Sequence, residues 1–109
     1  MLKELRSKVP LEIRSNSIED EYLEGVIQAK DMPVLNSILE KHLGHPLKKA
    51  GKSVSFKGEV LEVIDRIGGI RGDQTFYFCK KDDAVYFAAL WPWQSDPMRV
   101  TIKAGIIKT

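Results

Sequence analysis

His42 and His45 have the spacing of a pair of metal ligands, with two residues between them. Gly44 is expected to end the helix that carries His42, and Pro46 drives the residue before it towards an extended conformation. The two imidazole rings therefore need not converge, and Cys79, the only cysteine, lies far away in the sequence. We predict no metal site, and we expect His42 to be solvated near a helix C-terminus.

A second group of reactive side chains lies together at 79–83. Cys79 precedes two lysines that could favour a thiolate, and Asp82 and Asp83 are adjacent carboxylates. No signature of a cysteine enzyme surrounds the thiol, and adjacent aspartates at a hairpin tip are usually turn formers. No acid, base and nucleophile can be brought together from this sequence. We therefore predict a non-enzymatic protein, with no catalytic residue.

Two short glycine motifs match only parts of nucleotide-binding sequences. The segment 51–53, GKS, is the end of a nucleoside-triphosphate loop, but Pro46 stands where that motif needs its first glycine. The segment 68–72, GGIRG, lies between an expected helix and an expected strand, which reverses the order of a dinucleotide site. A helix cap and a turn account for these glycines. We predict no cofactor.

Trp93 is the strongest lead to a binding site. It lies between Pro92 and Pro97 in a polar loop, where a large aromatic side chain either folds back onto the domain or is offered to a partner. The two prolines restrict the loop, so binding through the indole would cost little conformational entropy. Because tryptophan is enriched at interface hot spots, we expect Trp93 to contact a partner.

The loop of Trp93 belongs to an expected C-terminal sheet. Three apolar runs, QTFYFC, AVYFAALW and MRVTIKAGII, lie between 74 and 107 and are separated by KKDD and PWQSDP. Short runs rich in aromatic and β-branched residues, bounded by turn formers, indicate strands. We predict an antiparallel three-stranded meander.

Side chains alternate along a strand, so the two faces of this meander can be separated. A four-residue connection, 80–83, would set Cys79 opposite Ala84. One face then carries Phe76, Phe78, Val85, Phe87, Ala89 and Trp91, and the other carries Thr75, Tyr77, Cys79, Tyr86, Ala88 and Leu90. We expect helices to cover the first face, together with Ile102 of the third run.

The third run alternates apolar residues with Arg99, Thr101 and Lys103, as a strand does when one of its faces is exposed to solvent. If these cations share the outer face with the tyrosines, that face combines aromatic rings with positive charge. We therefore predict a partner-binding surface on the outer face and its adjoining loop, formed by Trp93, Tyr77, Tyr86, Leu90, Arg99 and Lys103.

Upstream of the meander, the sequence predicts three helices. The apolar spacings favour helices over residues 18–30, 33–43 and 56–67, the first opened by a capping box at Ser17 and the second closed by Gly44. The alternation from Val9 to Ile13 favours a short edge strand, which would be a fourth strand of the sheet. The fold class is therefore α+β, with three helices on one face of the meander.

Length and composition limit the class of protein. A chain of 109 residues suits a single domain, 1–109, and 43% hydrophobic with 29% charged residues is typical of a globular protein. No apolar run is long enough for a membrane span, and the N-terminus lacks the apolar core of a signal peptide. With a single cysteine as well, we expect a cytoplasmic protein.

Two functions remain open. The first is an interaction domain that binds a protein partner or a second copy of itself, because two strands are apolar on both faces while the helices should cover one. The alternative is a winged-helix-like domain that binds nucleic acid through the basic segment with Lys48, Lys49, Lys52 and Lys57. The helix that follows carries Glu59, Glu62 and Asp65. Phosphate would repel a recognition helix with these carboxylates, which counts against the alternative.

Overall fold

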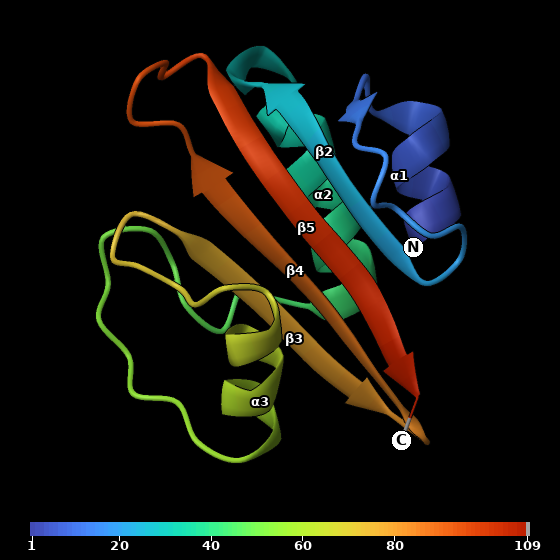
Figure 1. Cartoon of the computed structure of the whole chain (residues 1–109), viewed down its shortest axis with the longest axis vertical. Coiled ribbons are helices and arrows are strands. Elements are labelled where there is room, and N and C mark those ends of the chain that lie inside the picture. Colours follow the sequence, from blue (N-terminus) through green and yellow to red (C-terminus); the bar gives the residue numbers. More distant parts are fainter. Residues whose placement is uncertain (109) are drawn as a thin grey trace.

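The computed structural model describes residues 1–108, in which three α-helices and a five-stranded antiparallel sheet form an α+β fold. The elements are α1 (Leu2–Lys8), β1 (Glu12–Ile13), β2 (Tyr22–Gln28), the 3-10 turn η1 (Ala29–Asp31), α2 (Met32–Leu43), α3 (Glu59–Arg66), β3 (Thr75–Lys81), β4 (Ala84–Pro92) and β5 (Arg99–Lys108). The strand order is β1-β2-β5-β4-β3. Figure 1 shows α2 on one side of the sheet and α3 on the other. Among the described residues, no helix is long and apolar enough to cross a bilayer.

β3, β4 and β5 form the predicted meander, but the first hairpin is tighter than expected. Lys81 pairs with Ala84, and Phe78 pairs with Phe87. The expected four-residue connection is wrong, because Asp82 adopts a positive φ of 52° and turns the chain within two residues. The register therefore shifts by two residues. Since side chains alternate with a period of two, the predicted faces of β3 and β4 keep their members.

The helices cover both faces of the sheet, not one. On one face α3 packs its buried apolar residues on β3 and β4, in a core of Val63, Ile64, Ile67, Phe76, Val85, Phe87 and Ala89. On the other face α1 and α2 pack on the remaining side chains, and that core includes Leu5, Leu35, Leu39, Tyr77, Ala88, Leu90, Val100 and Ile102. The prediction that Ile102 shares a face with Phe76, Phe87 and Trp91 is therefore wrong.

The segment between α2 and α3 explains how two consecutive helices reach opposite faces. It passes the outer edge of β3, where Lys48 and Phe76 form an isolated antiparallel bridge. The backbone N–H of Phe76 donates to the Lys48 carbonyl at 2.9 Å, and the N–H of Lys48 donates back to Phe76 at 3.1 Å. The edge of β3 is therefore partly paired before the chain enters α3.

β2 occupies residues that were expected to form a helix. Its residues pair with β5 from Tyr22 to Gln28, and Leu23 and Ile27 are buried on the α2 side. The spacing of four that suggested a helix is also compatible with a strand, because both 22 and 26 lie on the same face of either element. Pairing with β5 decides between the two, so the predicted helix over 18–30 is wrong.

The N-terminal segment combines a helix and a very short strand. Residues 2–8 form α1, and the predicted edge strand is present only at Glu12 and Ile13, which pair with Val26 and Gly25 of β2. A Cβ on Gly25 would lie 3.1 Å from the backbone oxygen of Glu12, so this close pairing favours glycine.

An ionic cluster joins α1 to α2. Glu4 accepts a hydrogen bond at 2.6 Å from His42 and lies 3.1 Å from the ammonium of Lys41 and 3.2 Å from that of Lys8. These contacts, with His42 first, lower the pKa of Glu4 to about 2. His42 therefore binds a carboxylate of the same chain, which is a structural role.

Candidate functional site

On the side that carries α3, the sheet is covered over only part of its width. Ala89 of β4 packs under α3 and pairs with Lys103 of β5, which places Lys103 on the same side. The pairs Glu24–Lys103, Val26–Thr101 and Gln28–Arg99 therefore all point to this side. Figure 1 shows no helix over β2 and β5 there. We call these six residues, Glu24, Val26, Gln28, Arg99, Thr101 and Lys103, the open face. Gln28 and Arg99 are exposed, Glu24, Thr101 and Lys103 are half-buried, and Val26 is 6% exposed.

Trp93 lies at the border of the open face. Its indole Nε1 donates a hydrogen bond to Oγ1 of Thr101 at 2.8 Å. The guanidinium of Arg99 stacks on the ring, 5.4 Å from its centroid, and forms an ion pair with Asp96 at 3.2 Å. Trp93 is half-buried, so its indole is held in one orientation while part of it stays accessible.

Lys103 is held at the other end of the open face. Its ammonium lies 3.6 Å from the ring centroid of Trp91 and donates to the backbone carbonyl of Ile67 at 2.9 Å. Burial lowers the pKa of Lys103, and the negative charge of Glu24 opposes that shift. A Cβ on Gly68 would lie 3.3 Å from the Trp91 ring. Trp91 is therefore a packing residue at the end of α3.

Glu24 supplies the negative charge of the open face. Its carboxylate accepts hydrogen bonds from the Tyr22 hydroxyl at 2.6 Å and from the Asn16 amide at 3.2 Å. Burial acts to raise the pKa of Glu24, but these hydrogen bonds and the charge of Lys103 outweigh it and hold the pKa below its ordinary value. At neutral pH the open face therefore carries an anion on β2 beside cations on β5.

The structure separates the six predicted partner-binding residues into two groups. Trp93, Arg99 and Lys103 lie together at the open face, as described above. The other three lie on the opposite face, where α1 and α2 cover the sheet: Tyr77 and Leu90 are 2% and 3% exposed, and Tyr86 is partly buried. The expectation that Tyr77 and Leu90 form an outer, accessible surface is wrong. Tyr77 instead donates its hydroxyl hydrogen bond to Asn36 at 3.2 Å.

Glu24 was not among the predicted site residues, because its segment was interpreted as a helix. The signal was present in the alternation of Tyr22, Glu24, Val26 and Gln28 with Leu23, Gly25 and Ile27, which is the period of a strand. That alternation places Glu24 on the polar side of β2.

The four lysines of the basic segment differ in exposure. Lys49, Lys52 and Lys57 are exposed, but Lys48 is 4% exposed. The Lys48 ammonium donates to the carbonyls of Gln74 at 2.6 Å, Gly72 at 3.1 Å and Lys49 at 3.2 Å. The prediction that Lys48 contacts an anion or nucleic acid is wrong, because its donors are directed to backbone inside the protein.

Comparison with protein-family models, with curated proteins and with solved structures finds no match for this chain. Within residues 1–108, no group of three or more His, Cys, Asp or Glu side chains could hold a metal ion. The functional assignment therefore rests on the geometry of the open face.

Proposed function

We propose that this protein is a non-enzymatic interaction domain that self-associates through the open face, with Trp93 at the rim of the contact. The observation that carries the proposal is the charge pattern of two neighbouring strands that no helix covers. Glu24 on β2 lies directly beside Lys103 on β5. Trp93, Arg99 and Met98 are of residue types enriched at protein interfaces, whereas Glu24 and Lys103 are of types that an interface accepts only when their charges are matched.

A two-fold contact supports self-association, because such an interface must be complementary to its own copy. Consider a two-fold axis that runs parallel to the strands, between β2 and β5. Rotation about this axis places β2 of one copy over β5 of the other at the same height. Glu24 then faces Lys103 of the second copy, and Gln28 faces Arg99 of the second copy. Under this operation the opposite charges of Glu24 and Lys103 meet twice, and Arg99 meets a neutral amide.

Trp93 suits the rim of this contact. Its hydrogen bond to Thr101 and its stacking on Arg99 fix the indole before binding. Ordering a side chain at an interface costs free energy, and that cost is small for an indole that is already held. Met98, in the same loop, is 60% exposed and offers further apolar surface.

Charge reversal tests the proposed pairing. Glu24→Lys and Lys103→Glu are each expected to weaken self-association about tenfold or more, because each sets like charges against each other in the contact. The double variant should restore most of the wild-type affinity. Light scattering with size-exclusion chromatography, over a range of protein concentrations, measures the effect.

Lys57→Glu is the matched control, since Lys57 is exposed and lies outside the open face. Circular dichroism checks that each variant is folded. A wild-type protein that stays monomeric at about millimolar concentration would exclude the proposal. Self-association that is indifferent to both single reversals would place the contact elsewhere.

Nucleic-acid binding is the alternative, and the exposure of Lys49, Lys52 and Lys57 is what supports it. α2 and α3 lie on opposite faces of the sheet, so they do not form the helix pair of a winged helix. Binding would therefore have to use the loop alone. If DNA binds there, replacing these three lysines by glutamine should reduce the slope of log affinity against log salt by about three. An unchanged slope would exclude the loop.

A further inference from the structure

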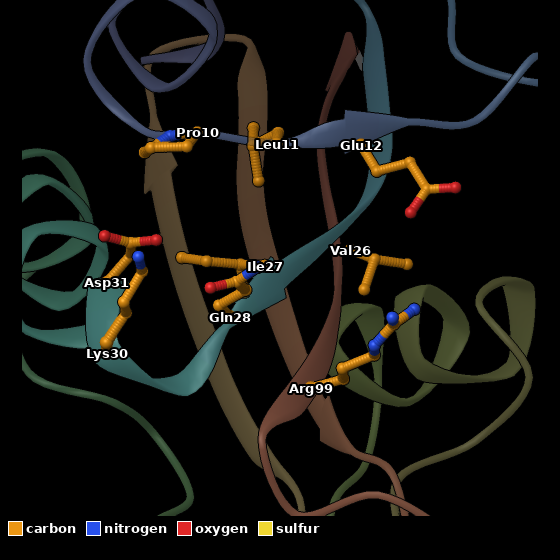
Figure 2. Close-up of a pocket in the computed structure, with 9 residues that line it drawn as sticks. All are labelled: Pro10, Leu11, Glu12, Val26, Ile27, Gln28, Lys30, Asp31 and Arg99. Carbon is orange, nitrogen blue, oxygen red and sulfur yellow. The ribbon is translucent and has the colours of Figure 1, made fainter.

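A row of paired residues crosses the sheet through the centre of the open face. Glu12 of β1 pairs with Val26 of β2, and Val26 pairs with Thr101 of β5. Thr101 pairs in turn with Trp91 of β4. Side chains of paired residues point to the same side of a sheet, so Glu12 and Trp91 flank the open face at its two borders. Figure 2 shows Glu12 and Val26 on the same side of β2 as Arg99.

Glu12 carries an unpaired carboxylate at one end of this row. Glu12 is exposed, and within residues 1–108 its side chain makes no hydrogen bond or ion pair. β1 is the edge strand on this side of the sheet and has only two residues. Glu12 also lines a pocket of about 430 Å³, which leaves room around the carboxylate (Figure 2). The carboxylate is therefore accessible from the side of the open face.

Lys103 brings a positive charge to the other end of the row. Lys103 pairs with Ala89 in the neighbouring row, but its ammonium lies 3.6 Å from the centroid of the Trp91 ring. Its side chain therefore extends over β4, away from β1. One of its three N–H donors is used by the carbonyl of Ile67, at 2.9 Å. Two donors remain for a carboxylate that approaches the Trp91 ring.

We propose that Glu12 of each copy pairs with Lys103 of the other copy when the protein self-associates. The inference rests on the proposed function and adds a second carboxylate to the contact. A two-fold axis between β2 and β5 exchanges the two ends of the row. Val26 of one copy then faces Thr101 of the second copy, and Glu12 faces Trp91, over which the Lys103 ammonium lies.

Arg14 is the other charged residue next to this part of the contact. Its N–H donates to the Glu24 carbonyl at 2.8 Å, which places Arg14 in the row of Glu24, Lys103 and Ala89. The same rotation therefore sets Arg14 opposite Ala89, which α3 covers. Two residues along a strand span about 7 Å. Glu12, and not Arg14, is the charge that shares a row with the Trp91 ring.

A two-fold axis that crosses the strands is the other symmetric way to stack two open faces. Such an axis through the same row would set Glu12 against Glu12 of the second copy, and Lys103 against Arg99. Both contacts join like charges, which weaken an interface. The axis parallel to the strands is therefore favoured, and a contact between Glu12 and Lys103 is specific to it.

Zero-length coupling with a water-soluble carbodiimide tests the pairing, because this reagent joins a carboxylate to an amine that it contacts. An equal mixture of ¹⁵N-labelled and unlabelled protein is coupled at a concentration where light scattering detects the self-associated species. Within one copy, β1 and β4 are three strand spacings apart, about 14 Å. We expect mass spectrometry to find Glu12 coupled to Lys103 in peptide pairs with one labelled and one unlabelled member. Glu12→Gln should remove this product.

Charge reversal of Glu12 gives a second readout. Glu12→Lys is expected to weaken self-association about tenfold, because it sets two ammonium groups against each other in the contact. Glu40→Lys is the matched control, since Glu40 is exposed on α2, at the opposite face of the sheet. It should associate as the wild type does. Circular dichroism checks that both variants are folded.

The outcomes separate this pairing from self-association itself. Association that depends on Glu24 and Lys103 but is unchanged in Glu12→Lys, without the mixed-label product, would overturn the pairing and leave the proposed function standing. A coupled product of Glu12 and Lys103 whose two peptides always carry the same label would come from a single chain, and would overturn the pairing as well. A wild-type protein that stays monomeric would exclude the self-association and the pairing with it.

Discussion

Replacing Phe87 by alanine is expected to lower the free energy of unfolding by about 3–5 kcal/mol, the range for loss of a buried aromatic ring. Phe87 is 4% exposed and belongs to the core beneath α3. Its ring lies over Gly105 so closely that a Cβ there would be 2.8 Å from the ring carbon Cζ. Backbone on one side and α3 on the other leave little room for the cavity to collapse. Urea denaturation of the monomer measures the change.

Tyr86→Ala is the matched comparison, because Tyr86 is the preceding residue and lies on the opposite face. Tyr86 is only partly buried, with Lys81 5.8 Å from the centre of its ring. Its loss should therefore cost less than that of Phe87, about 1–3 kcal/mol. Equal losses at the two positions would contradict the difference in their burial.

The meander and α2 could be predicted because their signals are local. The polar side of β5, with Arg99, Thr101 and Lys103, alternates regularly with apolar residues. α2 starts near Pro33, which is compatible with a first helical turn, and ends before Gly44, which adopts a φ of 79°. In both elements, the backbone preference and the burial pattern favour the same structure.

The position of the helices could not be predicted, because it depends on the path of a connection. Residues 44–58 pass the edge of β3, and Lys48 pairs with Phe76 on the way. α3 consequently packs on the face opposite to α2. Tyr77 and Leu90 were expected to be accessible because all helices were placed on one side. Apolar residues on both faces of β3 and β4 in fact indicated a sheet covered twice.

The candidate site was predictable in part for the same reason. Trp93, Arg99 and Lys103 come from one strand and the loop before it, so alternation alone brings them together. Glu24 joins them only because β2 pairs with β5, a contact between residues far apart in the sequence. β1 likewise joins β2 only through Glu12 and Ile13, which pair with Val26 and Gly25. Such contacts leave no periodic pattern in the sequence.

Lys48→Met is expected to lower the free energy of unfolding by about 1–3 kcal/mol, which is large for a lysine. Methionine keeps the length and apolar stem of the side chain but removes all three donors. The carbonyls of Gly72 and Lys49 keep backbone donors, the N–H groups of Gly51 at 2.6 Å and Lys52 at 3.1 Å. The Gln74 carbonyl loses the ammonium that now binds it at 2.6 Å, and a buried acceptor without a partner costs about 1–3 kcal/mol.

Lys52→Met is the control, since Lys52 is exposed in the same loop and should change stability by less than about 0.5 kcal/mol. Urea denaturation of both variants gives the comparison. The stabilising hydrogen bonds of Lys48 are opposed by the cost of burying its charge. Lys48 is 4% exposed, and its ammonium is bonded to carbonyls and not to a carboxylate. If Lys48→Met were neutral, that cost would equal the gain from the three hydrogen bonds. A loss confined to Lys48 would instead show that the hydrogen bonds of this lysine stabilise the crossing of the chain past β3.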